Sequence, residues 1–310
     1  MIRRMECRDS DAIREIDKLC FRENNARRKE GIEGYIEVGQ NSSLVYELDG
    51  KVVGYNFLHI WGALGWLGPI GVHPEYQGKG VGKELVEQTI KVLKEEYKVS
   101  TVALNTMPEI PYNVGFYMDL GFTPLKLSLN MIKKIDFSNT SNLENAYAAE
   151  RLDITQEENY VEIEEALKNI SKEAFQDFDL TSELYLIKNK AFGTVFTLKA
   201  HDKIRGIVIC YTKSLREENT KKLQIKLAVM DSFLDYKIAL DSIMKALTEY
   251  CGEIGFNSIA IDANTYNEDI CNYLMSKHAF KIERTQIFMT MGKENPFENK
   301  NILLLTRLAG

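Results

Sequence analysis

From Val72 to Lys83 the chain reads Val-His-Pro-Glu-Tyr-Gln-Gly-Lys-Gly-Val-Gly-Lys. The apolar run Trp66–Val72 precedes this stretch, and apolar residues at helical spacing follow it at Leu85, Val86, Ile90 and Leu93. This order predicts a strand, a glycine-rich loop and a helix. The first amides of a helix have no intrahelical partner, and glycines let a phosphate approach the main chain. The stretch therefore predicts a site for a dianion, with Lys79 and Lys83 adding positive charge at its rim.

Two other phosphate-binding loops do not fit this stretch. A P-loop has four residues between its glycines, whereas three separate Gly78 from Gly82, and Glu84 stands where a hydroxyl would bind magnesium. The dinucleotide fingerprint fails because its third glycine would come one residue later. A glycine-rich turn without a ligand is the remaining alternative, and Gln77 with the preceding Val-x-Pro-x-Tyr turn argues against it.

Two segments of the chain resemble the signatures of one enzyme family. Gln77–Gly82 resembles the Q/R-x-x-G-x-G/A motif of the GNAT superfamily of N-acetyltransferases, and Leu67–Tyr76 resembles the strand and turn that precede this motif. Phe116–Phe122, which reads Phe-Tyr-Met-Asp-Leu-Gly-Phe, is similar to the second signature of the family. The two motifs stand in the right order, and with the elements between them they cover most of Met1–Lys134.

The resemblance implies an α/β fold with a twisted mixed sheet, flanking helices and central parallel strands that splay apart. Acetyl-CoA would be the cosubstrate, and no metal is expected. Its pantetheine would pair with backbone groups of Ile70, Gly71 and Val72. Its pyrophosphate would lie on Gln77, Gly78, Lys79, Gly80, Val81, Gly82 and Lys83. An acceptor amine would attack the thioester directly, without a covalent enzyme intermediate.

Three further residues are candidates for the site. Tyr117 matches the tyrosine of the family that protonates the leaving CoA thiolate, which a phenol of pKa about 10 can do; the alternative is a core aromatic. Asn113, four residues before Tyr117 on the same helix face, and Asn105, at the end of a strand, could bind the cofactor or simply cap the chain. Trp66–Gly71 holds no carboxylate, so the sequence assigns no general base.

The second half of the chain repeats patterns of the first. Positions 72 and 229 are both Val, and Val102-Ala103-Leu104 is echoed by Ile259-Ala260-Ile261, each pair 157 residues apart. Leu120-Gly121-Phe122 is echoed by His278-Ala279-Phe280, 158 residues on. A near-constant offset predicts a duplicated fold. We expect an acyl-CoA-binding GNAT domain over 1–135, a Ser/Asn/Thr-rich linker over 136–152 and a GNAT-like domain over 153–310.

The second copy has lost the residues of the cofactor site. The offset places Leu234–Ala239, which has no glycine and contains a carboxylate, where the first copy has its loop. The position that corresponds to Tyr117 is Met275, which cannot donate a proton. The second half is therefore expected to cover an edge of the first, shape the acceptor pocket or form a dimer. The final strand, Ile302–Leu305, could pair with either sheet.

Bulk properties agree with a cytoplasmic enzyme. The 310 residues carry a net charge of −6 without a long basic run, which argues against a nucleic-acid binder. The five cysteines form no C-x-x-C pair, which favours reduced thiols, and no apolar run is long enough for a membrane helix. The region where the family builds its acceptor site contains four basic residues, Arg22, Arg27, Arg28 and Lys29. They could form a solvated basic helix face, or they could contact an anionic acceptor.

The sequence thus predicts an acyl-CoA-dependent N-acyltransferase, with acetyl-CoA the expected donor and one competent site. A small amine, an amino-sugar, an antibiotic or a protein terminus could be the acceptor. A non-catalytic acyl-CoA-binding regulatory module is the alternative, motivated by the missing carboxylate. A purely structural interaction protein is a third, and the intact loop argues against it.

Overall fold

A computed structural model describes residues 1–21, 26–137, 147–217, 221–292 and 294–308 of the chain. It has a mixed α/β fold in which the strands of the described residues form one mixed sheet. No helix in these ranges is long and apolar enough to cross a membrane.

The elements of the first half run in the order β1, α1, α2, β2, β3, β4, α3, β5, α4, β6. Their bounds are β1 Ile2–Arg4, α1 Ser10–Phe21, α2 Lys29–Val38, β2 Leu44–Leu48, β3 Lys51–Trp61, β4 Leu64–Val72, α3 Val81–Lys91, β5 Thr101–Thr106, α4 Pro111–Asp119 and β6 Thr123–Lys134.

The second half follows the same order, from β7 to β12, and adds a last strand. Its bounds are β7 Ala148–Leu152, α5 Glu157–Ala174, α6 Tyr185–Lys190, β8 Gly193–Ala200, β9 Lys203–Tyr211, β10 Lys222–Asp231, α7 Tyr236–Ile254, β11 Ser258–Asn264, α8 Glu268–Ser276, β12 Lys281–Met291 and β13 Ile302–Leu305. Each pair of echoed sequence segments falls on elements of the same rank in the two halves.

Part of the expected linker 136–152 is a strand. Ala148–Leu152 forms β7, which pairs antiparallel with β8, because backbone pairing at the sheet edge can recruit a segment that lacks aliphatic periodicity. Residues 138–146 of the expected linker lie outside the described residues.

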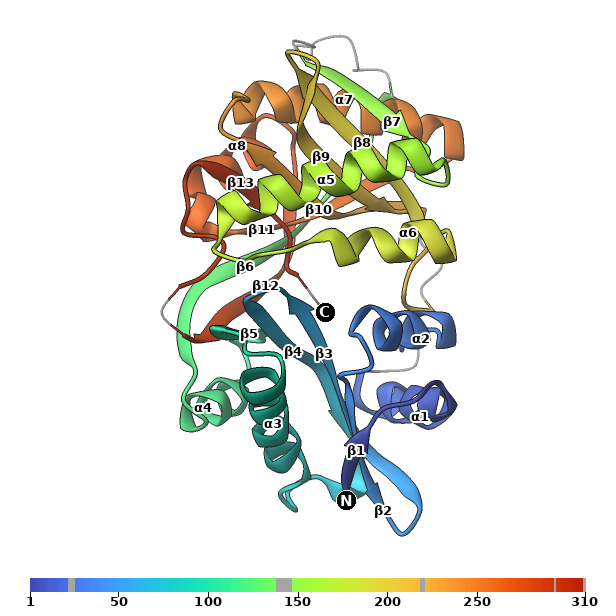
Figure 1. Cartoon of the computed structure of the whole chain (residues 1–310), viewed down its shortest axis with the longest axis vertical. Helices are drawn as coiled ribbons and strands as arrows, with labels where there is room; N and C mark the ends of the chain where they lie inside the picture. The colour runs from blue at the N-terminus through green and yellow to red at the C-terminus, as the bar shows by residue number, and fades with distance from the viewer. Residues whose placement is uncertain (22–25, 138–146, 218–220, 293, 309–310) are drawn as a thin grey trace.

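The two halves exchange their last long strands. The sheet order is β1-β2-β3-β4-β5-β12-β6-β11-β10-β9-β8-β7, with β13 attached to β10. Strand β5 therefore pairs with β12 of the second half, and β11 pairs with β6 of the first. Figure 1 shows these strands crossing between the lower, blue-to-green half and the upper half. The sheet is consequently continuous through both halves.

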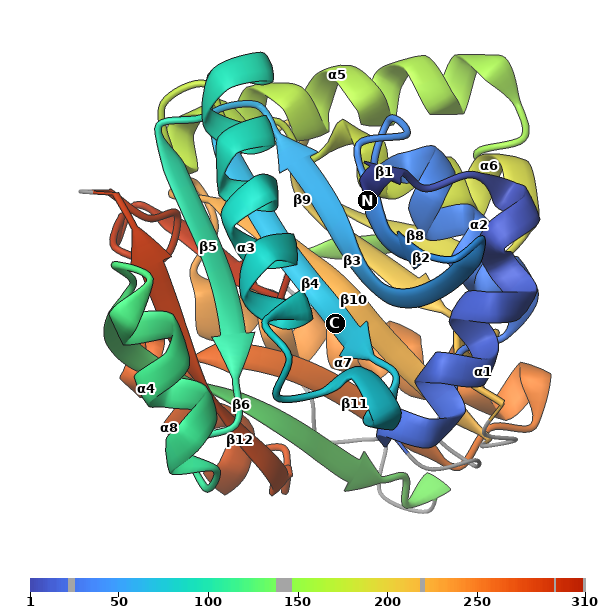
Figure 2. The ribbon, with the colours of Figure 1, turned by 90° about the horizontal axis from the view of Figure 1, so that it is seen from below.

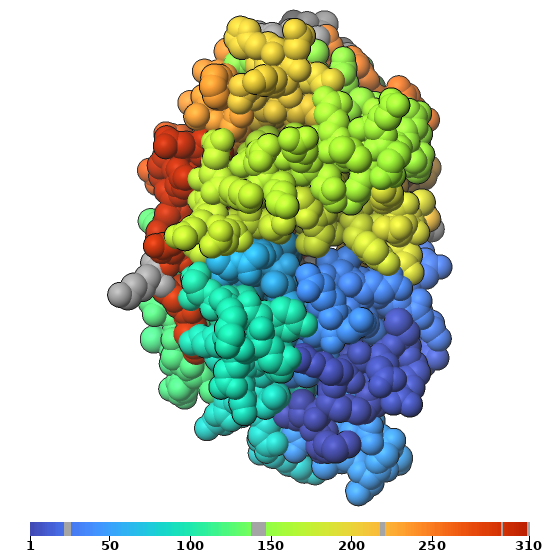
Figure 3. Space-filling view, in the orientation of Figure 1, coloured from blue at the N-terminus to red at the C-terminus, as the bar shows by residue number. Residues whose placement is uncertain are grey.

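A hydrophobic cluster also spans the two halves. Trp61 and Trp66 of the first half are buried among apolar side chains of the second. The Trp66 ring stacks on Phe288 at 6.0 Å between centroids, and the Trp61 indole N–H donates to Glu183 at 3.0 Å. The halves meet across the width of the molecule in the face shown in Figure 3. Separating them would expose this cluster and break two strand pairings.

The helices of the first half cover both faces of its strands. Helices α1 and α2 lie on one side of β3 and β4, and α3 and α4 lie on the other (Figure 1). The predicted turn at Asp49-Gly50 joins β2 to β3, with Gly50 at a φ of +75°. Gly121 ends α4 with a φ of +91°, as expected for a helix C-terminal glycine.

We predict that the full chain unfolds in one cooperative transition, and that residues 1–135 alone do not fold. Without the second half, β6 would lose its pairing with β11 and β12, and Trp61 and Trp66 would be exposed. Denaturant titrations followed by tryptophan fluorescence and by far-ultraviolet circular dichroism test this. Two separate transitions, or a folded 1–135 fragment, would contradict it.

Candidate active site

The loop between β4 and α3 presents open backbone amides. Gly80 precedes the helix with a φ of +87°, and no side chain caps this end. The first intrahelical bond runs from the Glu84 amide to the Gly80 carbonyl at 3.0 Å. The amides of Val81, Gly82 and Lys83 therefore have no partner within the helix. With the helix dipole, they form a site for a phosphate group.

Side chains of the loop hold its conformation. The Gln77 side-chain amide donates to the Val72 carbonyl at 2.9 Å, which ties the start of the loop to the end of β4. Gly78 has a φ of +73°, and nothing would lie within 4 Å of a Cβ there. Lys79 and Lys83 are exposed at the rim of the loop, where their charge can reach a bound anion.

The parallel strands β4 and β5 part at the same end of the sheet. They pair only at Leu64↔Thr101, Gly65↔Val102 and Trp66↔Ala103. Beyond Trp66, strand β4 stays on β3 while β5 stays on β12, and the two diverge, as Figure 2 shows. Beyond Trp66, no strand of the described residues therefore pairs with the inner backbone edge of β4.

That edge carries two of the three residues predicted to bind pantetheine. The His73 amide donates to the Val53 carbonyl, so alternate residues of β4, Gly71 and His73, bond to β3. Ile70 and Val72 consequently turn their backbone groups toward the gap. The Val72 carbonyl accepts a hydrogen bond from the Gln77 side chain. The Val72 amide therefore remains as the group that faces the gap. Gly71 contributes close packing instead: a Cβ would lie 2.6 Å from the Tyr55 ring.

Tyr117 lies on α4 on the face of the sheet that α3 covers. Its side chain is 8% exposed and packs edge-to-face against Phe116 and Phe122. Burial raises the pKa of Tyr117 to about 12. Its hydroxyl has no hydrogen-bond partner in the described part of the chain. The phenol is therefore fully protonated and available to a group that enters from the gap.

The two candidate asparagines differ in their surroundings. Asn113 lies one turn before Tyr117 on α4 and is half-buried, with no side-chain bond to other described residues. Asn105 on β5 is already bonded within the protein: its Nδ2 donates to the Arg307 carbonyl at 3.3 Å, and its Oδ1 accepts from Ser128 at 3.2 Å. Asn105 thus contacts the C-terminal segment rather than facing α3.

The sequence profile of the acetyltransferase (GNAT) family matches residues 10–122. These residues include the loop, both parting strands and Tyr117. Residues 10–122 form a GNAT acetyltransferase domain.

Curated relatives match only a short part of the GNAT domain. An uncharacterized N-acetyltransferase ycf52 of Gracilaria tenuistipitata var. liui is 43% identical over 51 residues, 16% of this chain and 26% of the relative. The ycf52 protein of Porphyra purpurea is 39% identical over 51 residues, 16% of this chain and 27% of the relative. The match thus spans about a quarter of the length of these relatives.

Solved structures resemble the whole chain in fold. A putative acetyltransferase from Pyrococcus horikoshii is 17% identical with a TM-score of 0.68, covering 97% of this chain and 91% of that one. A GCN5-related N-acetyltransferase from Sphaerobacter thermophilus is 14% identical with a TM-score of 0.66, covering 96% and 98%. The fold of the whole chain, including the part outside residues 10–122, is therefore shared with other proteins of similar length.

The second half closes the helix end that the GNAT domain leaves open. The Asp235 carboxylate caps α7 and accepts from the amides of Lys237 and Ile238 at 3.0 and 3.1 Å. These amides correspond to those that α3 leaves open. A fixed carboxylate at this end would also repel a phosphate.

The gap between parallel strands is closed in the second half as well. Strand β10 pairs with β11 only from Lys222 to Ile225, and beyond that β13 pairs with β10, from Ala228↔Leu305 to Asp231↔Ile302. The sequence left the partner of Ile302–Leu305 open, and the structure assigns it to the second half. A strand of the chain itself thus occupies the place where the GNAT domain has an open gap.

The basic residues near the first two helices do not act as one group. Arg27 is buried, with its guanidinium bonded to Asp17 at 2.5 Å, whereas Arg28 and Lys29 are exposed. Arg22 lies outside the described residues. Sequence reasoning missed the cavity beside Arg27, whose other walls come from the second half and the C-terminal segment.

We predict that Gly80→Val weakens acetyl-CoA binding about tenfold or more. A β-branched residue disfavours the left-handed φ of +87°, and its side chain would intrude where a phosphate meets the loop. Calorimetric titration of acetyl-CoA measures the effect. Gly50→Val is the matched control, because Gly50 has a φ of +75°, open space around it and no place in the loop. An equal affinity loss in both variants would contradict the assignment.

Proposed function

We propose that this chain is an acyl-CoA-dependent N-acyltransferase that uses acetyl-CoA and has one competent site. One observation carries the proposal: an uncapped helix N-terminus with a glycine loop stands at the open end of two parting parallel strands. The pyrophosphate of CoA would bind the loop Gln77–Lys83. Its pantetheine would lie in the gap and bond to the backbone of Ile70 and Val72.

The reaction is a single displacement. The neutral amine of the acceptor attacks the thioester carbonyl carbon, a C–N bond forms and the C–S bond breaks. CoA leaves as a thiolate and takes up a proton, and the attacking nitrogen releases one to solvent. No residue of β4 near the gap is a carboxylate, so the acceptor would bind in its neutral form or lose its proton to water.

Tyr117 is the proposed acid for the thiolate. A phenol whose pKa is raised to about 12 keeps its proton at neutral pH. A thiolate that forms beside it would take up that proton, and the phenolate left behind would regain one from solvent as the attacking nitrogen releases its own. Asn113, on the same face of α4, would bond to the cofactor, whereas the existing bonds of Asn105 favour a supporting role.

The second half would serve the site without binding a cofactor. Asp235 and β13 occupy the two places that CoA would need, which supports a degenerate GNAT-like domain after residue 153. Its contribution would be to close the face of the first half that lies opposite α3.

Calorimetric titration of acetyl-CoA into the full chain tests the proposal. We expect one site per chain. A stoichiometry of two would place a second site in the second half, and no binding by a folded sample would overturn the acyltransferase assignment. Acetyl-CoA binding without CoA release, across a broad set of amines, would favour a regulatory acyl-CoA sensor instead.

We predict that Tyr117→Phe lowers turnover about tenfold or more and leaves acetyl-CoA affinity and stability nearly unchanged. The hydroxyl that is removed bonds to no described residue, so its loss should not disturb packing. Steady-state rates of CoA thiol release, with calorimetry alongside, measure both effects. Tyr112→Phe is the control, because Tyr112 is 76% exposed on the same helix. An unchanged rate in Tyr117→Phe would remove this residue from the mechanism.

A further inference from the structure

A cavity of about 230 Å³ lies between the two halves. Arg27, which lies between α1 and α2, forms one wall, and residues 213–216, which follow β9, form the next. Arg27 and Arg216 bridge these two segments in antiparallel register, and the Arg28 guanidinium donates to the Arg216 carbonyl at 2.8 Å. Residues of α2, of strands β6, β9, β10, β11 and β12, and of the segment that follows β13 complete the lining. Neither half could form this cavity alone.

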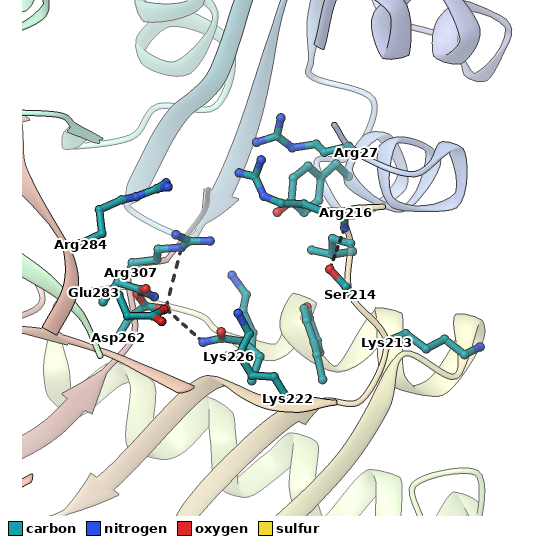
Figure 4. A pocket seen from close by; sticks show the side chains of 15 residues that line it. Arg27, Lys213, Ser214, Arg216, Lys222, Lys226, Asp262, Glu283, Arg284 and Arg307 are labelled. Atoms are coloured by element: carbon teal, nitrogen blue, oxygen red, sulfur yellow. Dashed lines mark hydrogen bonds and ion pairs between the residues drawn. The ribbon is translucent and has the colours of Figure 1, made fainter. Parts of the chain in front are cut away.

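The cavity concentrates positive charge in an acidic protein. Seven of its lining residues are cationic and two are acidic, although the chain carries a net charge of −6. Figure 4 shows Lys213 pointing away, and the remaining cations gathered around the cavity. These are Arg27, Arg216, Lys222, Lys226, Arg284 and Arg307.

Four carboxylates in the described part of the chain lie among or close to these cations. Asp17 pairs with Arg27, and Glu183 pairs with Lys226 at 3.5 Å. Neither of these two carboxylates belongs to the lining. The Asp262 carboxylate lies 3.9 Å from Nε of Arg307 and also accepts hydrogen bonds from Asn130 and Gln224. Glu283 is the second acidic residue of the lining. Among the described residues, Asp262 and Glu283 are thus the acids that belong to the lining itself.

Arg216 is affected by the neighbouring positive charges. Burial, and then the charges of Arg27 and Arg307, lower the pKa of Arg216 to about 10. The positive charge of this guanidinium is therefore less stable here than in water. An oxyanion among these groups would relieve the repulsion, and guanidinium groups match carboxylate and phosphate geometry.

The cavity adjoins both parting strands of the GNAT domain. Asn105 on β5 donates to the backbone carbonyl of Arg307. On the β4 side, Asp17 bonds to Arg27 and to the Tyr55 hydroxyl, and the Tyr55 ring packs against Gly71. These contacts lie on the face of the sheet that α1 covers, opposite α3. A ligand in the cavity would thus approach the gap from the side away from the CoA loop.

We propose that this cavity binds the acceptor, and that the acceptor is a small amine bearing a carboxylate or a phosphate group. The inference rests on the proposed acyl transfer. The oxyanion would bind Arg216 with its neighbours, and the amine would point to the gap between β4 and β5. There it forms the C–N bond as the C–S bond of the thioester breaks, and CoA leaves as the thiol.

Anion binding tests the cavity directly. Inorganic phosphate and malonate are titrated calorimetrically into the protein saturated with CoA, so that the loop is already occupied. We expect at least one to bind, and Arg216→Gln to weaken binding about tenfold. Arg284→Gln, at an exposed position, is a second variant that should fold and also weaken binding. Arg8→Gln is the control, since the Arg8 side chain is 70% exposed and does not belong to the lining.

Matched amines then test the acceptor class. Rates of CoA thiol release are compared for phosphoethanolamine against ethanolamine, and for β-alanine against β-alaninamide. We expect the anionic member of a pair to have the higher kcat/KM, and Arg216→Gln to remove the preference without changing acetyl-CoA affinity. The pair that responds distinguishes a phosphate from a carboxylate.

Two results would overturn the inference while acetyl-CoA still binds. One is that neither anion binds the CoA-loaded protein, or that binding is unchanged in both variants. The other is equal or higher kcat/KM for the neutral amines. Failure of acetyl-CoA itself to bind would instead overturn the proposed function, so the two failures are separable.

Discussion

The pairing of β5 with β12, and of β11 with β6, is the constraint on which the rest of this molecule depends. Each half supplies the strand that completes the sheet of the other, and Trp61 and Trp66 are buried by the contact that results. The exchange fixes the relative position of the halves. It also brings the loop between β9 and β10 beside the segment between α1 and α2, where the basic cavity forms.

The two halves share an order of elements but differ at the end where their parallel strands part. Both contain parallel strands that part after a few paired residues, followed by a helix. In the first half glycines leave the amides open, and the gap has no strand in it. In the second half Asp235 satisfies the amides, and β13 supplies the hydrogen bonds that the edge of β10 would otherwise lack. Buried backbone groups need partners, so an unused gap is filled by the chain itself.

The two proposed anion sites obtain their positive charge in different ways. The proposed CoA loop relies on backbone amides and a helix dipole, with lysines only at its rim. The cavity on the opposite face is lined instead by guanidinium and ammonium groups that the fold brings together. The gap between β4 and β5 lies between these two regions, which is the arrangement that transfer from a bound thioester to a bound amine requires.

The sequence by itself determined the local features of this protein. The spacing of Gly78, Gly80 and Gly82 between an apolar strand and an amphipathic helix predicted the loop, and the family profile over residues 10–122 confirmed the resemblance. The roles of Tyr117 and Asn113 remain predictions. Asn105 could not be placed from the sequence, because its partners, Ser128 and Arg307, are remote along the chain.

Only the tertiary structure decided the strand exchange, the position of β13 and the cavity. Backbone hydrogen bonds are chemically alike in every strand, so an apolar pattern predicts that a segment pairs but not with which edge. Arg27, Arg216 and Arg307 are likewise far apart in the sequence, which singled out Arg27 only as a neighbour of Arg22, Arg28 and Lys29. Glycine spacing and helix periodicity, by contrast, act over a few neighbouring residues, which is why they could be read from the chain alone.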